Sequence, residues 1–156
     1  VSGYFGPFFN EIHVNDYSLD FTYPFTLAHE MAHQFGVGPE SEANLYAFVT
    51  CASSGDPRVR YSAYASTLGY VLNDAYRFLP DEYESIYRSV RPEILEDLKR
   101  NREHWLAARD EALSSAQDKM YDAYLKTNKV SSGQENYSEV VALLVSSYDL
   151  FSPFFR

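Results

Sequence analysis

The feature that most constrains the fold of this chain is the pentapeptide His29-Glu30-Met31-Ala32-His33. Residues i and i+4 of an α-helix project from the same face, so two imidazoles at this spacing can bind one Zn²⁺ ion while the intervening Glu reaches a metal-bound water. The arrangement works only if the segment is helical. The sequence therefore predicts a helix here, with a metal site on one of its faces.

Glycine and proline residues mark the expected ends of this helix and of the next. Pro24 and Gly36 bracket a helix over about residues 25–35. The Gly-Val-Gly that starts at Gly36 predicts a turn, and Pro39 suits the first turn of a second helix over about 39–53. The two helices would form a tight hairpin.

Two different patterns precede the motif. Residues 3–9 (GYFGPFF) are punctuated by Gly and Pro, which predicts an aromatic-rich loop. Residues 11–15 (EIHVN) alternate polar and apolar side chains, which predicts a short half-exposed edge strand beside the metal site, where an extended peptide could pair. Residues 4–9 and 151–155 either line the site or form an interface with a membrane or a parent protein.

The remaining patterns are helical. Asp56 is the expected N-cap of a long helix from Pro57 to about Phe78. Further along, the sequence predicts breaks at 80–81 and 91–92, a charged helix over about 92–126, a polar loop over 127–136 and a last helix over about 138–150. Residues 1–156 thus read as a single, mostly α domain with a minor strand element (α+β minor), carrying an HExxH helix, a second ligand-bearing helix and a short edge strand.

Two glutamates compete for the third ligand position. A catalytic zinc has three protein ligands and an open position for water, and His29 and His33 supply two. The expected hairpin returns the start of the second helix to this pair, but Glu40 and Glu42 point about 200° apart around it, so only one faces the metal.

The neighbours of the two glutamates favour Glu40. Its helix face continues through small residues that allow close helix packing, whereas the face of Glu42 continues through larger apolar residues that suggest packing surface. Asn44, one turn after Glu40, is placed where it could orient a ligand.

The pattern also suggests catalytic roles. Glu30 would act as general base on the zinc-bound water and then as acid toward the leaving amine. Tyr137 is the candidate donor to the developing oxyanion, with Tyr61, Tyr64 and His104 as weaker alternatives.

Charge and composition limit the partners. The net charge of −9 argues against nucleic acid, because phosphate binding relies on clustered Lys and Arg. Cys51 is alone and is expected to be a buried apolar thiol. No apolar run approaches the roughly 18 residues of a membrane span. Because the chain begins at Val1 without an initiator Met, we expect a domain processed or excised from a longer protein.

The motif and its surroundings resemble a known group of enzymes. The segment PFTLAHEMAHQ at 24–34, then Gly36, then ESEAN at 40–44, resembles gluzincin-type metallopeptidases with an HExxH…ExxA(D/N) pattern. The group includes the membrane-embedded CAAX-processing type and the sensor-transducer type of antibiotic resistance. The resemblance implies a zincin-like domain in which Glu40 is the third ligand and Asn44 stands where an Asp is usual.

A second likeness covers nearly the whole chain. With RYSAY at 60–64 and NYSEVVALL at 136–144, the sequence resembles the C-terminal domain of a bacterial family of unknown function grouped with membrane-anchored zinc metallopeptidases. This implies a membrane anchor in segments outside this chain. Two features depart from the relatives: the connection between His33 and Glu40 is shorter than in most gluzincins, and Pro39 stands where HExxHxxGxx(H/D) enzymes have their third ligand.

These observations predict a zinc-dependent metallopeptidase that hydrolyses a peptide or protein substrate. The main alternative is a domain that binds zinc for structure or sensing without catalysis. A helical interaction module without metal and a metal-dependent hydrolase of other substrates are the remaining alternatives.

Overall fold

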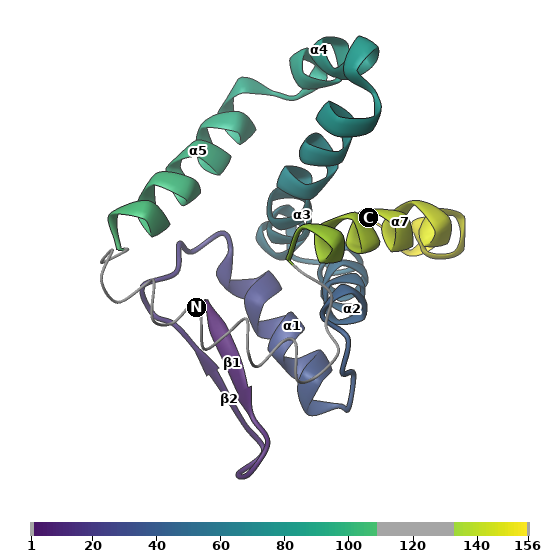
Figure 1. Ribbon diagram of the computed structural model, residues 1–156. Coiled ribbons are helices and arrows are strands. Elements are labelled where there is room, and N and C mark those ends of the chain that lie inside the picture. The colour runs from purple at the N-terminus through teal and green to yellow at the C-terminus, as the bar shows by residue number, and fades with distance from the viewer. Residues whose placement is uncertain (1, 109–132, 156) are drawn as a thin grey trace.

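The computed structural model describes residues 2–108 and 133–155, with the side chains of the second range described from residue 138 onward. Within these ranges the chain forms a two-stranded hairpin and six α-helices (Figure 1). The elements are β1 (Gly3–Gly6), β2 (Glu11–Val14), α1 (Tyr23–Gln34), α2 (Glu40–Ala52), α3 (Pro57–Phe78), α4 (Pro80–Ser89), α5 (Pro92–Ala107), α7 (Gly133–Phe151) and the 3-10 helix η1 (Ser152–Phe154). The prediction of a mostly α domain with a minor β element is confirmed.

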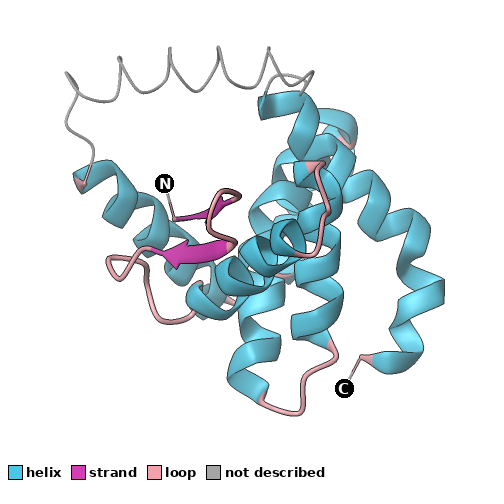
Figure 2. Cartoon of the chain, turned by 90° about the horizontal axis from the view of Figure 1, so that it is seen from below, coloured by secondary structure: helices cyan, strands magenta, loops and turns pink. Residues whose placement is uncertain are grey.

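The hairpin corrects the expected aromatic loop over residues 3–9. Gly3 to Gly6 form β1, which pairs antiparallel with β2 in the register Gly3↔Val14 and Gly6↔Glu11. Tyr4 lies opposite His13, and their rings stack with centroids 4.5 Å apart. Glycine has low strand propensity, so Gly3 and Gly6 give no strand signal in the sequence. The strand forms because it pairs with β2. The two strands form a small layer against the helices (Figure 2).

The helix ends follow the predicted signals closely from α1 to α3. Pro24 lies in the first turn of α1. Asp56 caps α3 as predicted, since its carboxylate oxygen Oδ1 accepts a 2.8 Å hydrogen bond from the backbone N–H of Arg58. The predicted break at Pro80 is real, but it opens a separate helix, α4, which the sequence reading missed.

Two predicted boundaries in the second half of the chain change. The structure describes α5 to Ala107, so the expected continuation toward residue 126 lies outside the described part. The helix α7 begins at Gly133, so residues 133–136 are helical where a loop was predicted. The rest of that predicted loop, 127–132, also lies outside the described residues.

The core lies where α1, α2 and α3 meet beneath α7. Its buried members are small or aromatic: Phe25, Ala47, Phe48, Cys51, Ala52 and Ala63. Burial raises the pKa of the Cys51 thiol to about 11, in agreement with the predicted buried thiol. Phe155 packs edge-to-face on Phe48 with centroids 5.5 Å apart, so part of the C-terminal aromatic segment belongs to the core.

The helices α4 and α5 project from this core as an arm (Figure 1) and contain no buried residue. Several contacts hold α5 in place. Among them, the Tyr61 hydroxyl donates to Asp97 at 2.5 Å, and the His104 ring stacks on Tyr17 with centroids 4.0 Å apart. None of the described helices combines the length and the apolar character needed to cross a membrane.

Candidate metal centre

The C-terminal end of α1 forms the first half of the site. Gly36 has φ of +97°, a left-handed conformation that favours glycine. Its N–H donates to the carbonyl of His33, and the N–H of Val37 donates to that of Ala32, which together form a Schellman motif. This turn ends the helix and reverses the chain within a few residues. It explains how so short a connection brings α2 back to α1.

The two histidines and Glu40 converge at this end. Nε2 of His29 lies 3.1 Å from Nε2 of His33 and 3.1 Å from Oε2 of Glu40. Nε2 of His33 lies 3.5 Å from Oε1 of Glu40. Ligand atoms of a tetrahedral zinc, each about 2.0–2.1 Å from the metal, are about 3.3 Å from one another. The three residues therefore form a group that could hold a metal ion.

The orientation of His33 is set by the same turn. Its Nδ1 donates a hydrogen bond of 2.7 Å to the carbonyl oxygen of Val37. In the neutral ring this fixes the proton on Nδ1 and leaves the lone pair of Nε2 directed at His29 and Glu40. Two imidazole nitrogens facing each other with a carboxylate are an arrangement that a cation would stabilise.

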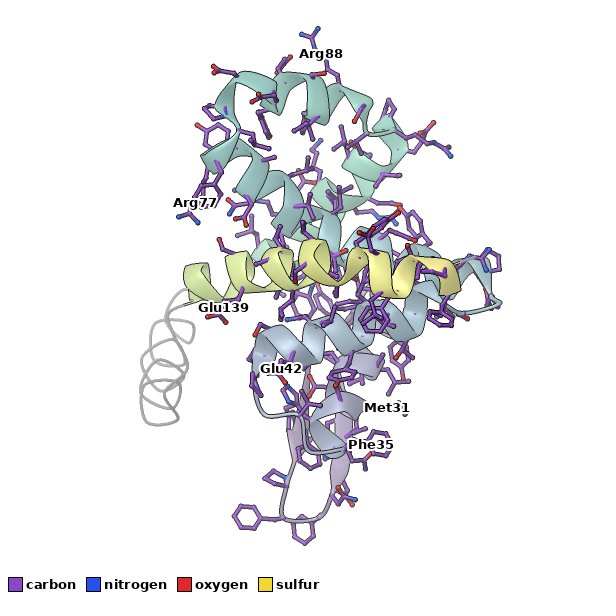
Figure 3. All side chains as sticks on the ribbon, turned by 90° about the vertical axis from the view of Figure 1, so that its right-hand side faces the viewer. Met31, Phe35, Glu42, Arg77, Arg88 and Glu139 are labelled. Atoms are coloured by element: carbon purple, nitrogen blue, oxygen red, sulfur yellow. The ribbon has the colours of Figure 1, made fainter. Side chains whose placement is uncertain are left out.

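Glu40 and Glu42 occupy opposite faces of α2. Glu40 is the first residue of the helix and points at the histidines, whereas Glu42 is exposed (Figure 3). The small residues on the face of Glu40 are buried as expected, with Ala43 and Ala47 both 0% exposed. The expected packing role of the opposite face is wrong at Tyr46, which is exposed.

Asn44 hydrogen-bonds the backbone of Glu40. Its Nδ2 donates a 2.9 Å hydrogen bond to the carbonyl oxygen of Glu40, within the first turn of α2. The bond thus reaches the main chain of Glu40 instead of a ligand side chain. The Nδ1 atom of His29 is buried and has no hydrogen-bond partner in the described part of the chain.

Ionic interactions hold the three residues together in the absence of metal. Burial alone would raise the pKa of the Glu40 carboxyl, but hydrogen bonds and charge from His29 and His33 lower it to about 2. The pKa of His33 is raised, mainly because its ring hydrogen-bonds Glu40. A carboxylate and a protonated imidazole are thus favoured when the site holds no cation.

Glu30 lies between the two histidines in sequence and beneath β1 in space. Its side chain is 6% exposed, and this burial raises the pKa of its carboxyl despite the nearby histidines. Gly3 covers it: a Cβ at this position would lie 2.9 Å from Oε1 of Glu30 and 3.0 Å from the His13 carbonyl oxygen. The absent side chain of Gly3 is what allows the Glu30 carboxylate its place.

Other sequence candidates for the site have different positions. The side chain of Tyr137, in the first part of α7, lies outside the described residues. The Tyr61 hydroxyl donates a hydrogen bond to Asp97, and the ring of His104 is in contact with the carbonyl of Tyr17. Tyr64 packs against Phe48. The structure thus places Tyr61, Tyr64 and His104 among partners outside the His29, His33 and Glu40 group.

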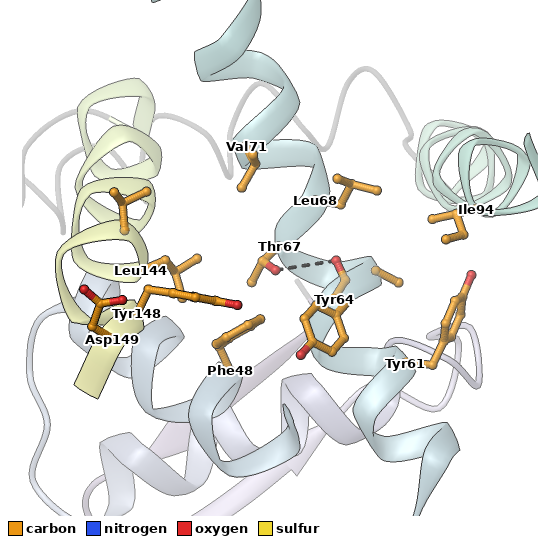
Figure 4. A pocket seen from close by; sticks show the side chains of 12 residues that line it. Phe48, Tyr61, Tyr64, Thr67, Leu68, Val71, Ile94, Leu144, Tyr148 and Asp149 are labelled. Atoms are coloured by element: carbon orange, nitrogen blue, oxygen red, sulfur yellow. Dashed lines mark hydrogen bonds between the residues drawn. The ribbon is translucent and has the colours of Figure 1, made fainter. Parts of the chain in front are cut away.

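A cavity of about 650 Å³ lies between α2, α3, α5 and α7 (Figure 4). Its lining is mostly apolar and includes Phe48, Leu68, Ile94 and Leu144. None of His29, Glu30, His33 or Glu40 lines it. The candidate metal centre is therefore separate from this cavity, and its donor atoms identify it.

Sequence reasoning missed two residues of the site. Val37 fixes the ring of His33, and the signal that could have revealed it is Gly36, which predicts a helix-ending turn with a fixed path for the next carbonyl. Gly3 covers Glu30 from a strand distant in sequence, and no local pattern indicates this contact.

No curated protein and no solved structure matches the chain. The model of a protein family, described as "Protein of unknown function (DUF3810)", matches residues 1–145. Because this match covers most of the 156 residues, the chain belongs to the DUF3810 family.

Proposed function

We propose that this chain is a zinc-dependent metallopeptidase domain. The observation that carries the proposal is the convergence of His29, His33 and Glu40 at 3.1–3.5 Å, beside the buried carboxylate of Glu30 on the same helix. Two imidazoles and one carboxylate form a ligand set that zinc hydrolases use, and it leaves a coordination position for water. Identification of the metal as Zn²⁺ rests on this donor chemistry.

The residues of the chain have separate roles in the proposed reaction. Bound zinc would supply a Lewis acid that polarises the scissile carbonyl and lowers the pKa of water. Glu30 accepts the proton of the attacking water and passes it to the leaving amine, and its raised pKa suits a group that must both take and release a proton. Tyr137 is proposed as the donor that stabilises the oxyanion.

The hairpin supports a peptide substrate. β1 passes directly over Glu30 at Gly3, and its edge away from β2 has no strand partner in the described chain. An extended peptide pairing with this edge would run past the carboxylate. The sequence placed β2 in this role, whereas contact with Glu30 favours β1.

The first test is metal content. We expect the purified chain to bind about one zinc per molecule, measured by elemental analysis after dialysis against zinc and then buffer. Glu40→Ala is expected to lose most of this zinc, while Glu42→Ala, two residues away on the exposed face, is the matched control and should keep it. Retention by Glu40→Ala together with loss by Glu42→Ala would contradict the ligand assignment.

The second test separates catalysis from binding. Glu30→Gln should keep the zinc and reduce cleavage of a mixed peptide library by about 10²-fold or more, because it removes the general base and leaves the ligands intact. If the chain cannot be loaded with zinc, the enzyme proposal fails. If wild type and Glu30→Gln bind zinc equally and neither cleaves peptides, the non-catalytic zinc domain is the correct alternative. That alternative is supported by the position of the ligands on both α1 and α2, because a bound metal would also stabilise the packing of these two helices.

A further inference from the structure

Three phenylalanine rings project into solvent at one end of the molecule. Phe8 and Phe9 lie in the turn between β1 and β2 and are 94% and 82% exposed. Phe35, directly after α1, is 80% exposed. We call Phe8, Phe9 and Phe35 the aromatic tip. Most large apolar side chains of a folded domain are at least partly covered, so three such rings together indicate an interaction surface.

A hydrogen bond from a side chain to the backbone holds the two parts of the tip next to each other. The Gln34 side chain donates a 2.8 Å hydrogen bond from Nε2 to the carbonyl oxygen of Asn10, which ties the hairpin turn to the end of α1. Asn10 has a left-handed backbone, with φ of 56°, and Gly36 fixes the turn on the other side. Phe35 and Met31, one turn apart, project outward at the hairpin end of the molecule (Figure 3). The rings are thus presented on a defined support.

The charge pattern indicates what the tip contacts. Residues 5–10 (FGPFFN) and 35–39 (FGVGP) contain no Asp, Glu, Lys, Arg or His, although the chain carries a net charge of −9. A protein interface usually has a polar rim with hydrogen bonds around its apolar centre. Insertion into lipid instead excludes ionised groups and favours aromatic side chains at the headgroup level. The first charged group after the turn is the exposed carboxylate of Glu11, which lies 3.5 Å from Nε2 of His13. The turn itself carries no charged group, and such a turn fits a bilayer better than a protein partner.

We propose that the aromatic tip inserts into the interfacial region of a lipid bilayer. Binding comes from burial of the three rings, because the tip has no basic residue to attract anionic headgroups. Zwitterionic bilayers are therefore sufficient, and added anionic lipid weakens binding of this acidic chain. The proposal requires neither a bound metal nor catalysis, so it stands or falls separately from the proposed function.

Vesicle sedimentation tests the proposal. The 156-residue chain should co-sediment with phosphatidylcholine vesicles, and the double variant Phe8→Ser, Phe9→Ser should lower the partition coefficient by at least about tenfold, because each ring loses most of its favourable transfer to lipid. Phe78→Ser, at the far end of α3, is the matched control: this ring is also exposed, and its removal should leave binding unchanged. Circular dichroism confirms that each variant keeps its helices.

A fluorescence measurement reports insertion directly. Trp105 is the one tryptophan of the chain, so Trp105→Phe with Phe9→Trp places a single probe on the tip. Its emission should shift to the blue on addition of phosphatidylcholine vesicles. The proposal is overturned if the wild-type chain does not bind these vesicles, if binding requires anionic lipid, or if Phe78→Ser weakens binding as much as the double variant. Sedimentation of the chain as a dimer that the tip substitutions dissociate would also overturn it, since a second copy would then cover the tip.

Discussion

Single atoms decide the geometry around Glu30. Its carboxylate is buried between α1 and β1, and Gly3 is the residue that leaves room for it. A side chain at this position would have to displace either Glu30 or the backbone at His13. In the proposed reaction, a general base must lie within hydrogen-bonding distance of the proton it removes, so a shift of this group has a direct consequence.

Gly3→Ala is expected to reduce the proposed hydrolysis by about 10²-fold, because moving a catalytic group by about 1 Å has effects of this size. Zinc content should not change, since the three atoms nearest to the added Cβ belong to Glu30 and His13 and not to the ligands. The matched control is Gly6→Ala in the same strand, where a Cβ would meet only the carbonyl oxygen of Glu11 at an ordinary 3.5 Å. Equal activity in the two variants would show that Gly3 does not position Glu30.

At the scale of elements, the site depends on how closely α1 and α2 approach. His29 and His33 lie on one helix and Glu40 on the other, so the distance between the helices fixes the distances between donor atoms. Ala47 and Ala43 make this approach possible, since both are fully buried on α2. The Schellman turn at Gly36 then joins the helices by a short, defined path.

Ala47→Leu should separate the two helices. Overpacking a buried alanine costs about 1–3 kcal/mol of unfolding free energy, which urea denaturation in the presence of a chelator measures. We also expect weaker zinc binding in competition with a colorimetric chelator, because Glu40 moves away from the histidines. Thr50→Leu, exposed on the same helix, is the control and should change neither quantity. Lower stability with unchanged zinc affinity would show that helix separation does not set the ligand geometry.

At the scale of the whole molecule, the site couples the stability of the fold to protons and metal. The raised pKa of His33 means that the folded chain holds this proton more tightly than the unfolded chain. That contribution is complete below pH 6.5 and is lost as the pH rises through the folded value. The lowered pKa of Glu40 contributes above pH 4.5 and is lost as the pH falls toward about 2.

The metal-free chain should therefore be most resistant to heat between pH 4.5 and 6.5. Burial of Glu30 moves the maximum toward the acid end of this range, because a raised carboxyl pKa removes stability as the pH rises above 4.5. Zinc binding requires unprotonated imidazoles, so the rise in Tm on adding zinc should grow from about pH 5 to about pH 8. At a zinc concentration of about 100 times Kd, the stabilisation is about 2.7 kcal/mol. Thermal melts with zinc and with chelator check both trends, and a zinc effect independent of pH would contradict histidine ligation.

The sequence by itself determined the elements whose signals are local. The spacing of His29 and His33, the prolines at the starts of helices and the glycine at 36 act within one or two helical turns, so α1, α2 and α3 were predicted nearly to their ends. The same local logic favoured Glu40, because opposite faces of one helix are fixed by residue spacing.

Only the tertiary structure decided the contacts between distant segments. It converted residues 3–6 from a loop to a strand, placed Gly3 over Glu30, and directed Asn44 to the backbone of Glu40. It also divided the aromatic segments, packing Phe155 of the C-terminal one against the core and leaving Phe8 and Phe9 exposed. Strand pairing and side-chain burial depend on residues far apart in the chain. The local periodicity of the sequence therefore does not show which distant residue a given residue will contact.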